Sequence, residues 1–80
     1  MRSRDETLTI NWRKVKSSNV ERVGWDNAGN MYVSYTGSGK LYKYVGVSRQ
    51  RVVACARSAS VGRYIQRKIK GHYKPIHIDL

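Results

Sequence analysis

The chain has 80 residues, which is enough for one domain with a small hydrophobic core. It carries 16 Lys and Arg against 5 Asp and Glu, a formal net charge of +11, and one cysteine, Cys55. A single cysteine excludes an intrachain disulfide, and we find neither a signal-peptide pattern nor an apolar run long enough to cross a membrane. We therefore expect a cytoplasmic protein without membrane association.

The distribution of charge is more informative than its sum. The acidic residues are Asp5, Glu6, Glu21, Asp26 and Asp79, so residues 27–78 contain none. Basic residues in that stretch repel one another, and a polyanion that releases its counterions on binding is the usual compensation. Nucleic acid is therefore the favoured partner. A solvated basic surface without such a ligand, an acidic protein and a membrane surface remain as alternatives.

Residues 1–14 form either an extra strand or an arm that orders on contact. Leu8, Ile10 and Trp12 alternate with polar residues, which is typical of a strand with one buried face. Trp12 could stack on a base, although a packing role is more common for tryptophan.

Residues 20–25, 31–35 and 41–45 are predicted to form an antiparallel β-meander, with tight turns at 26–30 and 36–40. Because Val20 and Val23 are three positions apart, we expect a bulge near Gly24. One face should be buried by Trp25, Met31, Val33, Tyr35, Tyr42 and Tyr44. The other face would carry Tyr32 and Lys43, which could receive a stacked base and a phosphate or simply face solvent.

Two short helices should follow and cover the buried face. Ser48 is a suitable N-cap for a helix over 49–58, and Ser60 for one over 61–70 that ends at Gly71. Residues 75–80 form a short tail or an edge strand. The predicted fold is α+β: a three-stranded antiparallel meander, two C-terminal helices on one face, and residues 1–14 as a fourth strand or an arm.

The second predicted helix supplies the best candidate site. Arg63, Arg67 and Lys70 are spaced i, i+4, i+7, and no acid is available on that helix to pair with them. We expect this face to contact phosphates, with help from Lys43, Arg49 and Arg57 and with stacking from Tyr32 or Trp12. The alternative is an ordinary solvated helix face.

Catalytic, nucleotide and metal sites are not indicated. Residues 37–40 resemble part of a P-loop, but Leu41 stands where Ser or Thr must bind magnesium. Cys55, His72 and His77 are too few and too scattered for zinc. No carboxylate is placed to work with either histidine, so we expect no enzyme, no catalytic residue, no metal and no cofactor.

Several spaced residues resemble the KTSC domain family. They are Ser17-Ser18, Val23-Gly24-Trp25-Asp26, the Met31-x-Val33-x-Tyr35 run, Tyr42-x-Tyr44-x-Gly46-Val47, the Ser60-x-Gly62-x-Tyr64 step, Ile69 and Tyr73. The resemblance covers residues 15–74 as one domain. It departs from the family at Ser48, where Pro is common, and at Ser58, where a small Ala is usual.

The resemblance implies a setting and a ligand class. The family is named for a small domain at the C-terminus of some lysyl-tRNA synthetases and also occurs alone in bacterial and phage proteins, which favours RNA over DNA. The leading hypothesis is a small non-catalytic nucleic-acid-binding module of a bacterial cell or a phage-infected host. The competing hypothesis is a phage-type regulator that binds a host or phage protein through its N-terminal arm or an exposed edge strand. The oligomeric state stays open.

Overall fold

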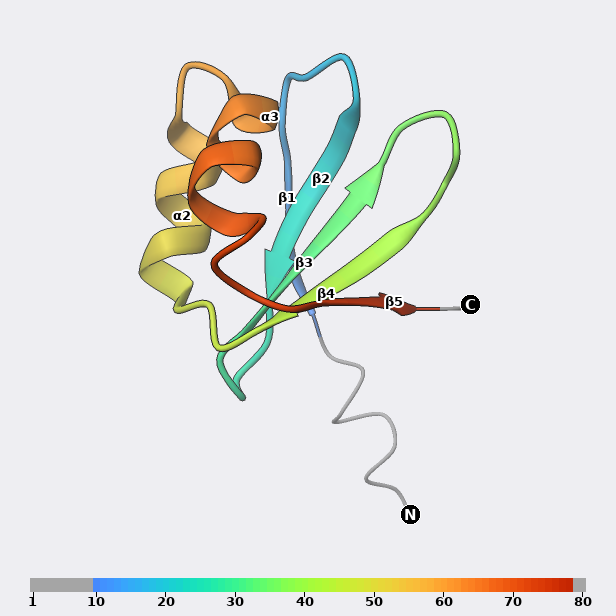
Figure 1. The fold of residues 1–80 in the computed structure, drawn as a ribbon. Helices are drawn as coiled ribbons and strands as arrows, with labels where there is room; N and C mark the ends of the chain where they lie inside the picture. Colours follow the sequence, from blue (N-terminus) through green and yellow to red (C-terminus); the bar gives the residue numbers. More distant parts are fainter. Residues whose placement is uncertain (1–9, 79–80) are drawn as a thin grey trace.

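The alternating apolar segments form an antiparallel sheet in the computed structural model, which describes residues 10–78. The sheet has five strands in the order β1-β2-β3-β4-β5, so neighbours in sequence are neighbours in space (Figure 1). The strands are β1 (Asn11–Lys14), β2 (Val20–Trp25), β3 (Asn30–Tyr35), β4 (Leu41–Val45) and β5 (Pro75–Ile78). The predicted meander is confirmed as β2, β3 and β4, the centre of this sheet.

Both ends of the described chain extend the meander by a strand. Residues 11–14 pair with β2, so this part of the predicted arm takes its strand alternative. Residues 75–78 return from the last helix to pair with β4, so this part of the C-terminal segment takes the edge-strand alternative. Leu8, which belongs to the predicted N-terminal alternation, lies outside the described residues.

The helical layer consists of α2 (Arg49–Arg57), α3 (Val61–Tyr64) and η1 (Ile65–Ile69), which lie together on one side of the sheet (Figure 1). Both predicted caps are confirmed. The Ser48 hydroxyl accepts a hydrogen bond from the Arg51 amide at 3.3 Å, and the Ser60 hydroxyl accepts one from the Arg63 amide at 3.4 Å. These bonds satisfy amides that a helix start would otherwise leave unpaired.

The hydrophobic core lies between the helices and the facing side of the sheet. All six residues predicted for the buried face belong to it or pack against it. The helices contribute Val52, Cys55, Val61, Ile65 and Ile69. Because every predicted apolar position faces the same layer, the strand register is the one that the period-2 pattern requires.

The β-bulge is not at the predicted position. The register of β2 against β3 shifts between Val20 and Arg22, which allows both Val20 and Val23 to face the core. Gly24 has a different role. A Cβ atom there would lie 2.8 Å from the Asn11 carbonyl oxygen and 3.0 Å from the Trp12 ring. Gly24 therefore permits β1 and the Trp12 indole to approach β2 closely.

Candidate nucleic-acid interface

The eight residues predicted to bind nucleic acid lie on two sides of the sheet. Arg49, Arg57, Arg63 and Arg67 belong to the helical layer and are all exposed. Trp12, Tyr32 and Lys43 stand in one cross-strand row of the register, on the face without helices. The sheet lies between these two groups, so they do not form one continuous patch.

The expected alignment of Arg63, Arg67 and Lys70 on one α-helical face is wrong. Residues 65–69 form a π-helical turn, in which the Lys70 amide donates to the Ile65 carbonyl at 2.8 Å. The wider turn changes the angular spacing of the side chains, and Lys70 itself has an extended backbone with ψ of 135°. Its ammonium lies 6.0 Å from the centroid of the Tyr35 ring. Arg63 and Arg67 remain on the helices, whereas Lys70 follows them at the end of the π-helical turn and lines a small hollow together with Asn19, Gly62 and Gln66.

The helical layer has no carboxylate of its own. Among the described residues only Glu21 and Asp26 are acidic, and both belong to β2 and the turn that follows it. The exposed cations of α2, α3 and η1 are Arg49, Arg51, Arg57, Arg63, Arg67 and Lys68. Their charge is thus available to an anionic ligand.

Arg49 is the least favourable of these cations for a phosphate contact. It lines a pocket together with Asn11, Trp25, Asp26, Asn27 and Gly29. The carboxylate of Asp26, which lines the same pocket, lowers the positive potential there. Arg57, Arg63 and Arg67 do not line that pocket and form the stronger set.

Tyr32 is not available for stacking. Only 4% of its surface is exposed, and its hydroxyl donates to Oδ2 of Asp26 at 2.7 Å. Burial and the nearby Asp26 carboxylate raise the pKa of Tyr32 to about 12. A base could reach this ring only by displacing the side chains that cover it, among them Trp12, so Tyr32 is a structural residue.

Trp12 is packed on the same face. The Arg22 guanidinium carbon lies 4.2 Å from the Trp12 ring centroid, which is a close cation–π contact. The Trp12 and Tyr32 rings meet edge to face with centroids 6.4 Å apart. The packing interpretation of Trp12 therefore accounts for its position.

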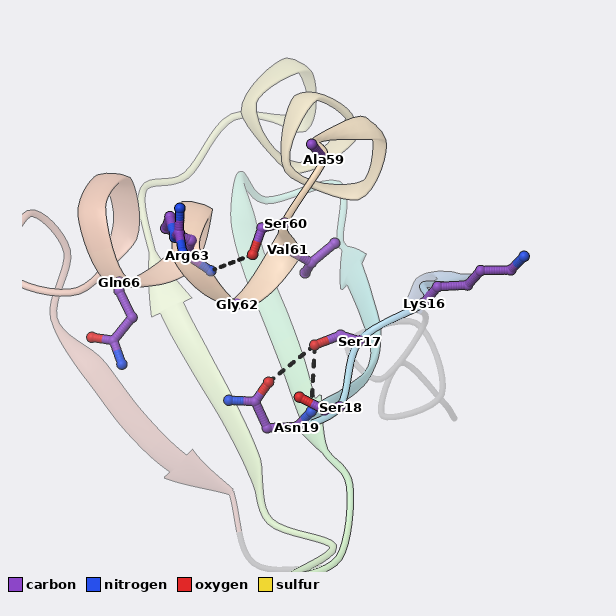
Figure 2. A pocket seen from close by; sticks show the side chains of 10 residues that line it. All are labelled: Lys16, Ser17, Ser18, Asn19, Ala59, Ser60, Val61, Gly62, Arg63 and Gln66. Atoms are coloured by element: carbon purple, nitrogen blue, oxygen red, sulfur yellow. Dashed lines mark hydrogen bonds between the residues drawn. The ribbon is translucent and has the colours of Figure 1, made fainter.

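A polar pocket of about 410 Å³ lies between the β1–β2 connection and the start of α3. Figure 2 shows the turn at residues 16–19 facing the segment that enters α3. The lining consists of Lys16, Ser17, Ser18, Asn19, Ala59, Ser60, Val61, Gly62, Arg63 and Gln66. Two segments at least 40 positions apart in the sequence thus build one hydroxyl- and amide-rich hollow.

The walls of this polar pocket are fixed by short contacts. The Ser17 hydroxyl donates to the Asn19 amide oxygen at 3.0 Å and accepts from the Val20 amide at 3.3 Å. A Cβ atom on Gly62 would lie 3.2 Å from that Asn19 oxygen, so the helix approaches the turn closely at this glycine. Lys16 extends outward from the turn (Figure 2), which leaves the interior to uncharged hydrogen-bonding groups with Arg63 at the side.

Sequence reasoning missed this pocket and the Arg22–Trp12 stack. The resemblance had already selected Ser17, Ser18, Ser60 and Gly62, but as separate segments. Their distance in sequence gave no sign that they would meet. The one available indication that they meet was that all four belong to the residues that carry the resemblance to the KTSC family.

Cys55 does not contribute reactive chemistry. Its side chain is fully buried, and burial raises the pKa of the thiol to about 12. Residues 10–78 contain no group of three His, Cys, Asp or Glu side chains that could hold a metal ion. None of the helices formed by these residues has the length and apolar content needed to span a lipid bilayer.

We compared the chain with models of protein families, with solved structures and with curated proteins to find its family. The model of the KTSC domain matches residues 16–73. The structure is similar to the crystal structure of the KTSC domain protein YPO2434 from Yersinia pestis, with a TM-score of 0.79 and 24% sequence identity. That match covers 89% of this chain and 100% of the other, and at this identity it concerns the fold. A search of curated proteins gave no match.

The family match extends over most of the described residues. It includes the turn and the helix start that line the polar pocket, together with strands β2 to β4 and all three helical segments. The chain belongs to the KTSC domain family.

Proposed function

We propose that this protein is a small non-catalytic module that binds single-stranded nucleic acid, RNA in preference to DNA, through the helical layer. Arg57, Arg63 and Arg67 contact the phosphates. The observation that carries the proposal is the set of exposed cations on α2, α3 and η1, in a stretch of sequence without any acid. Phosphate contacts of this kind position a strand without reading its sequence.

The polar pocket beside Arg63 supports the preference for RNA. A ribose 2′-hydroxyl both donates and accepts hydrogen bonds, and it distinguishes RNA from DNA. Ser18, Ser60 and Gln66 line the pocket with groups that can do the same. The occurrence of this domain type at the C-terminus of some lysyl-tRNA synthetases, implied by the sequence resemblance, points in the same direction.

Three phosphate contacts set the expected salt dependence. Each contact with a single strand contributes a slope of about −0.7 in the logarithm of the association constant against the logarithm of salt concentration. A total slope of about −2 means that a fourfold rise in salt weakens binding roughly 20-fold.

Charge reversal on opposite sides of the sheet tests the proposal. The Arg63→Glu/Arg67→Glu variant changes the helical layer. The Lys14→Glu/Lys43→Glu variant makes the same change in net charge on the face without helices, where the register places both lysines. Fluorescence anisotropy with a 12-nucleotide RNA should show a loss of at least 10-fold for the first variant and a much smaller loss for the second. Equal losses would contradict the assignment of the helical layer.

A protein-binding function is the second candidate, and the β5 edge favours it. β5 is an outer strand of the sheet, and Ile76 on it is 45% exposed, with Val45 on β4 48% exposed. A partner strand could pair with β5 beside these apolar residues. A partner captured by the wild type and by Arg63→Glu/Arg67→Glu, but lost with Ile76→Lys, would support this alternative.

A further inference from the structure

Another pocket differs in character from the polar one. It lies between the aromatic residues of β3 and β4 and the segment that leaves η1, and it encloses about 370 Å³. Its lining residues are Tyr35, Tyr42, Tyr44, Lys70, Gly71 and Pro75. The size is near the lower end of the range for small-ligand sites, about 300–1,000 Å³.

The aromatic wall of this pocket is held in place by ring contacts. The Tyr35 and Tyr42 rings meet edge to face with centroids 5.7 Å apart. The Tyr42 ring also contacts the His77 ring on β5, with centroids 5.3 Å apart. Tyr42 is therefore held by two neighbouring rings while part of its surface stays exposed, which gives a preformed surface for a flat ligand.

The opposite side of the pocket is cationic and open. The Lys70 ammonium lies 6.0 Å from the Tyr35 ring centroid, and the Lys70 backbone is anchored by its bond to Ile65. Gly71 has a φ of +84°, a conformation that turns the chain away and that other residues rarely adopt.

We propose that this aromatic pocket accepts one nucleobase of a bound single strand, stacked on Tyr42, while Lys70 contacts the adjoining phosphate. This inference rests on the proposed function and adds a base-binding position to it. The charge of the pocket selects the ligand class: the side chains that line it include a cation and no acid, which suits an aromatic ring attached to an anion. The π-helical turn matters because it takes Lys70 off the helix and places it here.

An abasic strand separates base binding from phosphate binding. An RNA of 12 nucleotides and a strand of the same length without bases are titrated at the same salt concentration. Base stacking on an aromatic side chain should make the intact strand bind at least fivefold more tightly. The Tyr42→Leu variant should remove this difference and leave the affinity for the abasic strand unchanged.

Lysine variants test the phosphate contact. Lys70→Ala should weaken binding of the intact strand more than Lys68→Ala, which removes an exposed lysine of η1 outside the pocket. Equal effects of the two variants would overturn the role of Lys70.

A measurement on the unmodified protein covers the case in which Tyr42→Leu disturbs folding. Adenosine monophosphate should shift the NMR signals of the Tyr35 and Tyr42 ring protons and of the Gly71 amide. Shifts confined to α2, or no preference for the intact over the abasic strand, would overturn the base pocket. If the abasic strand still binds with a steep salt dependence, the proposed nucleic-acid binding stands without the base pocket. If neither strand binds, both the base pocket and the proposed function are wrong.

Discussion

The hydroxyl of Tyr32 donates a 2.7 Å hydrogen bond to Oδ2 of Asp26, joining the middle of β3 to the turn that precedes it. The same carboxylate accepts from the Ala28 and Asn30 amides at 2.9 and 3.0 Å and from the Asn30 side chain at 3.1 Å. One aspartate thus organises the whole 26–30 turn. This explains why a conspicuous tyrosine on the face without helices is structural.

Replacing Asp26 by Asn should lower the free energy of unfolding at neutral pH by about 1–2 kcal/mol, because an amide nitrogen cannot accept from Tyr32 and Asn30. This expected loss is at the lower end of the range for hydrogen bonds to a charged group, because Asp26 is partly exposed to water. Tyr32→Phe, which removes one bond, should cost about 1 kcal/mol. Urea denaturation of the three proteins measures both differences.

The Asp26 contribution should depend on pH. Burial alone would raise the pKa of this carboxyl, but the hydrogen bonds from Asn30, Tyr32 and Ala28 outweigh it and lower the pKa below 3.8. Its stabilising effect is therefore complete above the unfolded-state pKa and is lost as the pH falls through the folded-state value. The gap between wild type and Asp26→Asn should shrink below about pH 4; a constant gap down to pH 2 would contradict this role.

Gly24→Ala should destabilise the junction of β1 and β2. The added methyl would lie 2.8 Å from a backbone oxygen of Asn11, which cannot move as a flexible side chain can. We expect a cost of about 1–3 kcal/mol, the usual range for overpacking. Gly62→Ala is the matched control, because its nearest neighbour is a side-chain oxygen at 3.2 Å. Thermal unfolding should show a clearly larger decrease of Tm for Gly24→Ala.

The Cys55 thiol should react only when the domain opens. Full burial and a pKa of about 12 leave almost no accessible thiolate at neutral pH. Labelling with a disulfide reagent should be slow in buffer and immediate in denaturant. Rapid labelling of the native protein would show that α2 separates from the sheet far more often than its packing suggests.

The centre of the fold could be predicted because its signals are local. Alternation at Met31, Val33 and Tyr35 sets the buried face, and Ser48 and Ser60 cap helices by bonds within three residues. Such patterns require no knowledge of which segments meet in space.

The features that were missed depend on tertiary context. The bulge between Val20 and Arg22 lets both Val20 and Val23 face the core, whereas Gly24 lies beneath Trp12. The sequence of β2 cannot show what packs over it. Likewise, the 61–70 segment has ordinary helical spacing, yet it adopts a π-helical turn that moves Lys70 next to Tyr35. The polar pocket and the aromatic pocket are each built from segments that are distant in sequence. The composition therefore revealed that the chain is rich in cations, but not which side chains would lie together.

The salt dependence of RNA binding tests the central claim most directly. The logarithm of the association constant is measured against the logarithm of salt concentration for wild type, Arg63→Glu/Arg67→Glu and Lys14→Glu/Lys43→Glu. We predict a slope of about −2 from the three arginines, or about −2.8 with the Lys70 contact added, a reduction in steepness of about 1.4 for the arginine variant, and little change for the lysine variant. Absence of binding at 50 mM salt, or the same slope for both variants, would contradict a phosphate-binding helical layer.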